Sequence, residues 1–122
     1  MTGKHHNPRG PLLDMQEYGR RVVALTSGRT AESLLGDAGW VTRAALERTL
    51  FIVGEAAHRV PREVRAQHPE IPWPAIIGLR NLLAHGYETI EPQKLWLTAT
   101  ISVPELLHHL NAVIARQPPF EA

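Results

Sequence analysis

The spacing of apolar residues after Trp40 constrains the fold more than any other feature of the sequence. The residues Leu46, Leu50, Val53, Ala57 and Val60 follow one another at intervals of four, three, four and three positions. This spacing places side chains on one face of an α-helix. No stretch of useful length alternates between apolar and polar residues, as a half-buried β-strand would. We therefore expect an all-helical chain.

Proline and glycine divide the N-terminal part of the chain. Pro11 suits the first turn of a helix, where its missing N–H has no helical partner. The buried stripe expected for that helix is Leu12, Met15, Val22 and either Leu25 or Thr26. The stretch "TSGRT" should end it. Residues 30–39, "TAESLLGDAG", are predicted to be a loop with at most one helical turn.

Prolines also mark the later elements. Pro61 ends the long central helix or opens a short segment that stops at Pro69, and "PEIPWP" reads as a rigid connector because each proline disfavours a helical conformation in the residue before it. Pro74 can begin the next helix. The ridge expected on that helix is Ile76, Leu79 and Leu83, and Gly86 is its expected stop.

Two more helices are predicted after this one. Pro92 should start the first and Pro104 the second. The side chains expected to point inward from the last helix are Leu106, Leu107, Leu110, Val113 and Ile114. The prediction is an all-α bundle of four to five helices, with one domain at 11–117 between polar tails at 1–10 and 118–122.

Composition excludes several classes of protein. The chain of 122 residues contains no cysteine, which rules out disulfides, thiolate chemistry and thiol-ligated zinc. This usage fits a reducing compartment, and we expect a cytoplasmic protein. No apolar run approaches the roughly 20 residues of a membrane helix, and the first residues lack the apolar core of a secretory signal. We expect no membrane partner.

Net charge gives little direct evidence for nucleic-acid binding. It is +1 for the whole chain. Residues 1–65 contain ten Lys/Arg and seven Asp/Glu, whereas residues 66–122 contain three and five. A surface that binds RNA would have to be local, or be doubled by oligomerisation.

Four reactive side chains lie within eight positions in the stretch "IIGLRNLLAHGYETIEP", residues 76–92. They are Arg80, Asn81, His85 and Tyr87. Arg80 and Tyr87 would be nearly aligned on an ideal helix, whereas His85 would lie about 140° from Arg80. If the helix ends near Ala84 or His85, the imidazole becomes free to turn toward Arg80.

This set of side chains suits RNA cleavage without a metal ion. Histidine can move a proton near neutral pH, and arginine binds phosphate through its planar fork of N–H groups. Asn81 could donate to a phosphate or orient the imidazole. The alternative is ordinary surface chemistry, because an arginine and a histidine on an exposed helix are usually solvated or paired.

The remaining histidines and tryptophans have simpler explanations. His58 and His68 lie near predicted helix ends, where contacts with the helix dipole account for them. His108 and His109 are adjacent, so they point about 100° apart and do not form a metal-binding pair. Trp73 and Trp96 are expected in the core or at an interface.

The stretch "LRNLLAHGY" resembles the R-x(4)-H-x-Y signature of the HepT branch of the HEPN superfamily, which consists of small helical ribonucleases that act as toxins. Upstream, "RTLFIVGEAAHRV" and "HPEIPWPAIIGLRN" are similar to the family's second long helix, its proline-rich connector and its motif helix. A weaker similarity continues into "LWLTATISVPELLHHL", so that the resemblance covers about residues 12–115.

The resemblance implies a role for each motif residue. Arg80 and His85 would be the catalytic pair, with Asn81 as a polar helper. Tyr87 falls at the position that a partner minimal nucleotidyltransferase antitoxin modifies with AMP in some HepT-like proteins. The family forms homodimers with both motifs in one cleft. RNA would be the substrate, with no cofactor or metal.

Two other functions stay open on the sequence. The chain could be a non-catalytic helical adaptor that binds such a nucleotidyltransferase, although an adaptor has no need of all three motif residues. It could also be a subunit that positions substrate for a split nucleotidyltransferase. Such a substrate-positioning subunit is expected to have an acidic or nucleotide-binding groove in place of an Arg–His cleft.

Overall fold

The computed structural model describes residues 9–85 and 90–117. Every regular element in that part of the chain is helical, which confirms the all-α prediction. The α-helices are α1 (Arg9–Thr26), α2 (Trp40–Arg59), α3 (Arg62–Gln67), α4 (Trp73–Ala84), α5 (Pro92–Leu97) and α6 (Val103–Arg116). None of these helices is long and apolar enough to cross a membrane.

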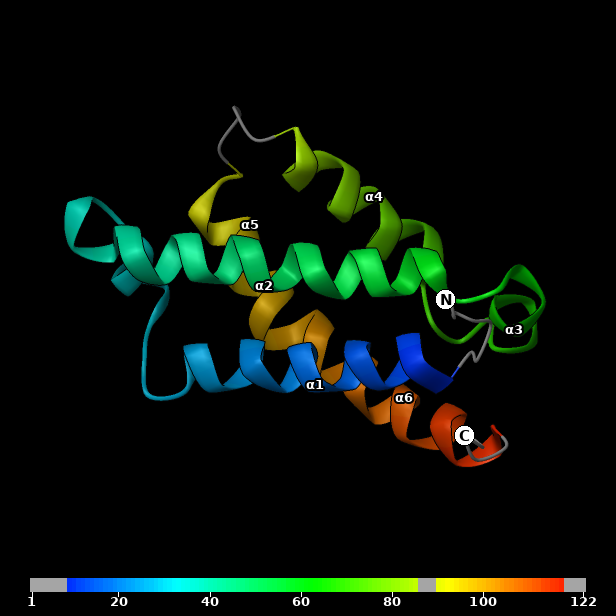
Figure 1. Cartoon of the computed structure of the whole chain (residues 1–122). Coiled ribbons are helices and arrows are strands. Elements are labelled where there is room, and N and C mark those ends of the chain that lie inside the picture. The colour runs from blue at the N-terminus through cyan, green and yellow to red at the C-terminus, as the bar shows by residue number, and fades with distance from the viewer. Residues whose placement is uncertain (1–8, 86–89, 118–122) are drawn as a thin grey trace.

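Helix α2 lies at the centre of the arrangement (Figure 1). Helices α1 and α2 run side by side, and α4 lies on the other side of α2 from α1. Helix α6 packs along α1. The main partner of α4 is α2, so the place of α4 in the fold depends chiefly on one helix–helix contact.

Helix α1 follows the predicted pattern closely. Its buried stripe contains Leu12, Met15 and Val22, and Thr26 rather than Leu25 completes it. The Thr26 hydroxyl donates to the carbonyl of Val23, 3.1 Å away, which satisfies this buried polar group. The helix begins at Arg9, two residues before the predicted boundary of the domain.

The segment after α1 is more ordered than predicted. It contains two 3₁₀ turns, at Ala31–Leu34 and at Asp37–Gly39, where at most one helical turn was expected. Leu34 is fully buried and anchors the segment to the core. Arg43 of α2 donates hydrogen bonds to the carbonyls of Leu34 and Gly36. A single buried leucine thus fixes a stretch whose composition is typical of a loop.

The last helix, α6, begins at Val103 with Pro104 in its first turn, as predicted, but no loop separates it from α5. A π-helical segment, Thr98–Ser102, connects α5 to α6. The Val103 N–H bonds to the carbonyl of Thr98, five residues back. In a regular α-helix the ring of Pro104 would press against the carbonyl four residues earlier, and the wider turn before it relieves that clash. With α5 and α6 as one rod, the described part of the chain has four longer rods and the short α3.

The core confirms the apolar pattern from which the fold was predicted. All five periodic residues along α2 and its C-terminal cap are buried. They divide between two adjoining clusters. In the first cluster they pack against α1, the proline-rich connector and the end of α6. In the second they pack against the 3₁₀ segment, α5 and the start of α6. Leu107 packs against both. Trp73 is buried as predicted, and Trp96 is partly buried.

Gly54 of α2 lies in close contact with α4. A Cβ atom at this position would lie 2.3 Å from the Cβ of Arg80 and 3.1 Å from the carbonyl oxygen of Ile76. Real side chains do not approach so closely, so only glycine permits this distance between the two helices. Gly78 lies on the outer face of α4, and a Cβ atom added there would meet no atom within 4 Å.

These two glycines give a matched test of the packing. Replacing Gly54 with alanine should lower the free energy of unfolding by about 1–3 kcal/mol, because α4 must move away from α2. Gly78→Ala should raise it by roughly 0.5–1 kcal/mol, since alanine is the better helix former and meets nothing there. Urea unfolding followed by circular dichroism measures both. An equal gain for the two variants would show that α4 does not need Gly54.

Candidate functional site

Arg80 lies on the side of α4 that approaches α2. Its Nε donates to the Glu55 carboxylate over 2.6 Å, and its Nη1 donates to the Oδ1 atom of Asn81, also over 2.6 Å. Charge-assisted hydrogen bonds of this length are among the stronger polar contacts of proteins. The Arg80 side chain keeps 28% of its surface exposed and that of Glu55 39%. The guanidinium is therefore held in place and still accessible.

Sequence reasoning missed Glu55. It lies 25 residues before Arg80 and on a different helix, so the local spacing around Arg80 could not indicate it. The only signal was its place in "GEA", a stretch that we used for the family resemblance and not as part of a site.

His85 follows the last residue of α4, as the sequence predicted. It is the C-terminal capping residue with φ −87° and ψ −6°, which is still close to helical backbone. On an ideal helix this position lies about 140° around the axis from Arg80. The side chain is exposed and makes no hydrogen bond or ion pair to the described residues. Tyr87 and Gly86 lie outside the described residues.

The exposed face of α4 mixes apolar and polar residues. It includes Pro74, Ala75, Gly78, Asn81 and Leu82, with His85 at its end. Leu82 keeps 43% of its surface exposed. Histidine thus shares its face with small and apolar side chains, whereas Arg80 lies at the edge that contacts α2.

A groove of about 650 Å³ lies between α4 and the rod of α5 and α6. Its floor is apolar and includes Leu50 and Val53 of α2. Its polar groups include the carboxylates of Glu70 and Glu105 and the amine of Lys94. Apolar walls and two carboxylates do not suit a phosphate chain, and neither Arg80 nor His85 lines this groove.

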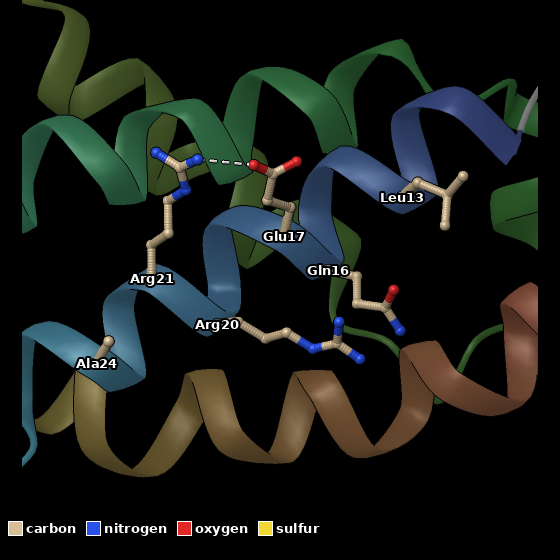
Figure 2. A pocket seen from close by; sticks show the side chains of 6 residues that line it. All are labelled: Leu13, Gln16, Glu17, Arg20, Arg21 and Ala24. Carbon is tan, nitrogen blue, oxygen red and sulfur yellow. Dashed lines mark hydrogen bonds and ion pairs between the residues drawn. The ribbon is translucent and has the colours of Figure 1, made fainter.

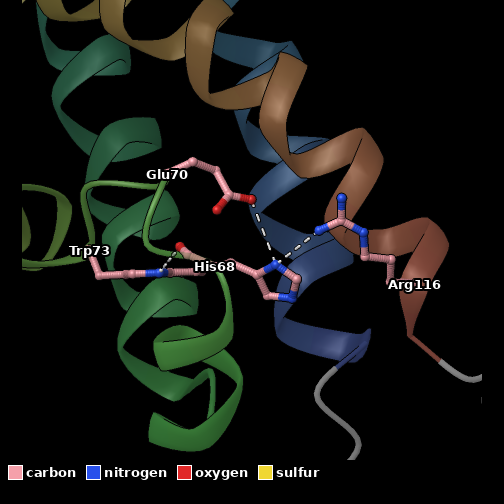
Figure 3. Close-up of polar contacts among 4 residues, drawn as sticks. All are labelled: His68, Glu70, Trp73 and Arg116. Atoms are coloured by element: carbon pink, nitrogen blue, oxygen red, sulfur yellow. Dashed lines mark hydrogen bonds and ion pairs between the residues drawn. The ribbon is translucent and has the colours of Figure 1, made fainter.

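A second polar cluster lies beside the N-terminal end of α4, where Trp73 begins that helix (Figure 3). His68 is only 3% exposed, which a position at a helix end did not predict. Its Nδ1 lies 3.5 Å from Nη1 of Arg116 and 3.6 Å from the Glu70 carboxylate. Its carbonyl accepts a hydrogen bond from the indole of Trp73, 3.0 Å away. The cluster ties the connector to α6, and we assign it a structural role.

Two exposed arginines of α1, Arg20 and Arg21, line a shallow hollow on that helix (Figure 2). Arg21 pairs with Glu17 one turn earlier, at 2.8 Å, and both side chains are more than half exposed. Arg20 extends toward α6 across the hollow (Figure 2). The pair partly cancels the local charge, and an exposed ion pair of this kind contributes little to stability.

No group of three or more His, Asp or Glu side chains within 9–85 and 90–117 has an arrangement that could hold a metal ion. The polar groups that the structure brings together around the motif are Arg80, Asn81 and Glu55. They can bind and orient an anionic group, and the exposed imidazole of His85 on the same helix can transfer a proton.

The fold and this site define a small helical domain with an anchored arginine and an exposed histidine five residues apart on one helix. Residues 15–113 match the family described as "Ribonuclease HepT-like". The chain belongs to this HepT-like ribonuclease family, as the motif predicted.

Individual relatives agree with this assignment. A protein named "Putative RNase" from Caldanaerobacter subterraneus subsp. tengcongensis is 32% identical over 90% of this chain and 96% of its own length. Another protein of that name, from Methanocaldococcus jannaschii, is 27% identical over 84% of each chain. A "Probable ribonuclease HepT" from Thermococcus cleftensis is 37% identical over 53% of this chain and 59% of its own. No solved structure matches the chain significantly.

Proposed function

We propose that the protein is a metal-independent endoribonuclease, the toxin of a pair whose antitoxin is a minimal nucleotidyltransferase. The observation that carries this proposal is the clamped guanidinium of Arg80 on the same helix as the exposed imidazole of His85, in a chain of the HepT-like ribonuclease family. The named relatives support RNA as the substrate.

In the proposed reaction the 2′-hydroxyl of RNA attacks the adjacent phosphorus. The new bond joins the 2′ oxygen to phosphorus, and the bond from phosphorus to the 5′ oxygen breaks. His85 moves the proton, either from the attacking hydroxyl or to the leaving oxygen. Arg80 binds the phosphate oxygens as their charge grows, and the amide nitrogen of Asn81 can donate beside it. The products are a 2′,3′-cyclic phosphate and a 5′-hydroxyl.

We further propose that the active form is a homodimer joined through the exposed face of α4. On an ideal helix the positions of Arg80 and His85 lie about 140° apart around the axis, so a second copy is the simplest way to complete the site. Leu82 offers exposed apolar surface to a partner helix, and the small Ala75 lies on the same face. A dimer would also double the positive charge available to RNA.

Catalysis is tested by single substitutions. Arg80→Ala and His85→Ala should each lower the rate of RNA cleavage by about 10²–10⁴-fold and abolish growth inhibition, because each removes a group needed in the transition state. Gel analysis of a labelled RNA measures cleavage, and circular dichroism checks the fold. The matched controls are Arg20→Ala on α1 and His108→Ala on α6, which change two exposed residues away from the motif. Both control variants should cleave RNA as fast as the wild type.

The same assay tests the role of metal. Cleavage should persist in EDTA and leave a 2′,3′-cyclic phosphate or its hydrolysis product. A strict requirement for added Mg²⁺ would contradict the mechanism.

The dimer is tested on the exposed face of α4. Leu82→Glu should convert a dimer into a monomer, because a carboxylate would be buried without a partner in the interface. The control is Leu13→Glu on α1, since the two leucines are similarly exposed at 43% and 40%. Light scattering at micromolar concentration measures the mass. A wild type that is monomeric there would refute the dimer, and a dimer that tolerates Leu82→Glu would place its interface elsewhere.

The proposed regulation acts on Tyr87. Addition of AMP to its phenol, two residues after His85 in the chain, would add a negative phosphate and a bulky nucleoside to the motif, which should block RNA without unfolding the protein. Coexpression with the neighbouring nucleotidyltransferase, followed by intact-mass analysis and peptide mapping, measures the modification. A Tyr87→Phe variant should escape neutralisation. An inactivated complex with unmodified Tyr87 would instead favour steric inhibition.

A further inference from the structure

Two consecutive residues of α2 govern the position of Arg80. Gly54 lets the Arg80 backbone approach, since a Cβ on Gly54 would lie 2.3 Å from the Cβ of Arg80. Glu55 then accepts the Nε–H of Arg80 over 2.6 Å. The first residue sets the distance between the helices, and the second fixes the end of the side chain.

The two contacts of the guanidinium determine which of its N–H groups remain for a ligand. Arginine has five N–H donors in one plane. Glu55 takes the donor at Nε, and Asn81 takes one of the two at Nη1. The other Nη1 donor and both Nη2 donors bond to no other residue in the described part of the chain. Three of the five donors, one at Nη1 and both at Nη2, are thereby left to bind the oxygens of a phosphate.

Fixing two points of a planar group fixes its orientation. An arginine side chain has several rotatable bonds, and holding it in one geometry before the substrate arrives removes an entropy cost from the reaction. A misplacement of about 1 Å in such a group can lower a rate by roughly 10²-fold. The carboxylate of Glu55 is therefore in a place to affect the rate without touching RNA.

We propose that Glu55 is a positioning residue, which holds the guanidinium of Arg80 so that its remaining N–H donors face the scissile phosphate. This inference rests on the proposed ribonuclease function. A carboxylate in that place also lowers the local positive charge. Its removal should therefore slow the chemical step while RNA binding stays the same or becomes tighter.

The experiment compares Glu55→Ala and Glu55→Gln with a matched ion pair on α1. Glu17 pairs with Arg21 at 2.8 Å, so Glu17→Ala and Glu17→Gln make the same changes in charge and chemistry away from the motif. Steady-state cleavage of a labelled RNA gives kcat and KM for each variant. Binding of the same RNA with 2′-deoxy sugars, which cannot be cleaved, gives the affinity. Thermal melting reports the folded fraction.

We expect Glu55→Ala to lower kcat by roughly 10- to 100-fold with an unchanged or lower KM and unchanged or tighter binding of the 2′-deoxy RNA. Glu55→Gln should recover part of the rate, because its amide oxygen can still accept the Nε–H bond. Both Glu17 variants should match the wild type. A role in folding alone would instead lower the folded fraction and leave kcat per folded molecule unchanged, which would overturn the proposal.

A spectroscopic measurement tests the contact itself. In a ¹H–¹⁵N spectrum the Nε–H of Arg80, assigned by its loss in Arg80→Lys, should exchange slowly with solvent in the wild type. The signal should be lost in Glu55→Ala and retained in Glu17→Ala. A signal that Glu55→Ala leaves unchanged would overturn the clamp.

The outcomes separate this inference from the proposed function. A wild type that cleaves no RNA would overturn both, because there would be no reaction for which Glu55 could position Arg80. An active wild type whose kcat is unaffected by Glu55→Ala would overturn the positioning role and leave the ribonuclease function standing.

Discussion

The close contact between α2 and α4 at Gly54 is the constraint on which the site depends. Helix α4 carries Arg80 and Asn81 and is capped by His85, and its main packing partner is α2. The absence of a side chain at Gly54 lets the Arg80 backbone come within van der Waals distance of α2. The neighbouring Glu55 is then within reach of the guanidinium. One backbone contact thus determines both the position of the helix and the partner of its arginine.

The pairing of Arg80 explains how a charged residue can lie on the packed edge of a helix. Burying a charge without a partner is costly, and even partial burial favours a bonded carboxylate nearby. Glu55 provides that carboxylate, and 28% of the Arg80 side chain stays exposed. The arrangement is stable enough to hold the guanidinium in one orientation and open enough to leave donors for a ligand.

The motif was partly predictable from local spacing. The prolines and the apolar spacing predicted one helix that carries Arg80 and Asn81. Gly86 predicted its end, and the helix does end beside His85. The direction of His85 was not predictable, because it depends on whether the last residue keeps a helical backbone. Glu55 could not be identified at all from the neighbourhood of Arg80, since the contact joins two helices 25 residues apart.

The sequence by itself determined the helical class, the buried stripes of α1 and α2, and the family to which the motif points. These properties depend on periodicity and on short stretches, in which each residue acts on its near neighbours. The tertiary structure decided the rest: the join of α5 to α6 through a π turn, the burial of His68, and the choice of Glu55 as partner of Arg80. Each of these features depends on which distant segments come together. The distance between two packed helices depends on the volumes of the side chains between them, which a local sequence pattern does not determine.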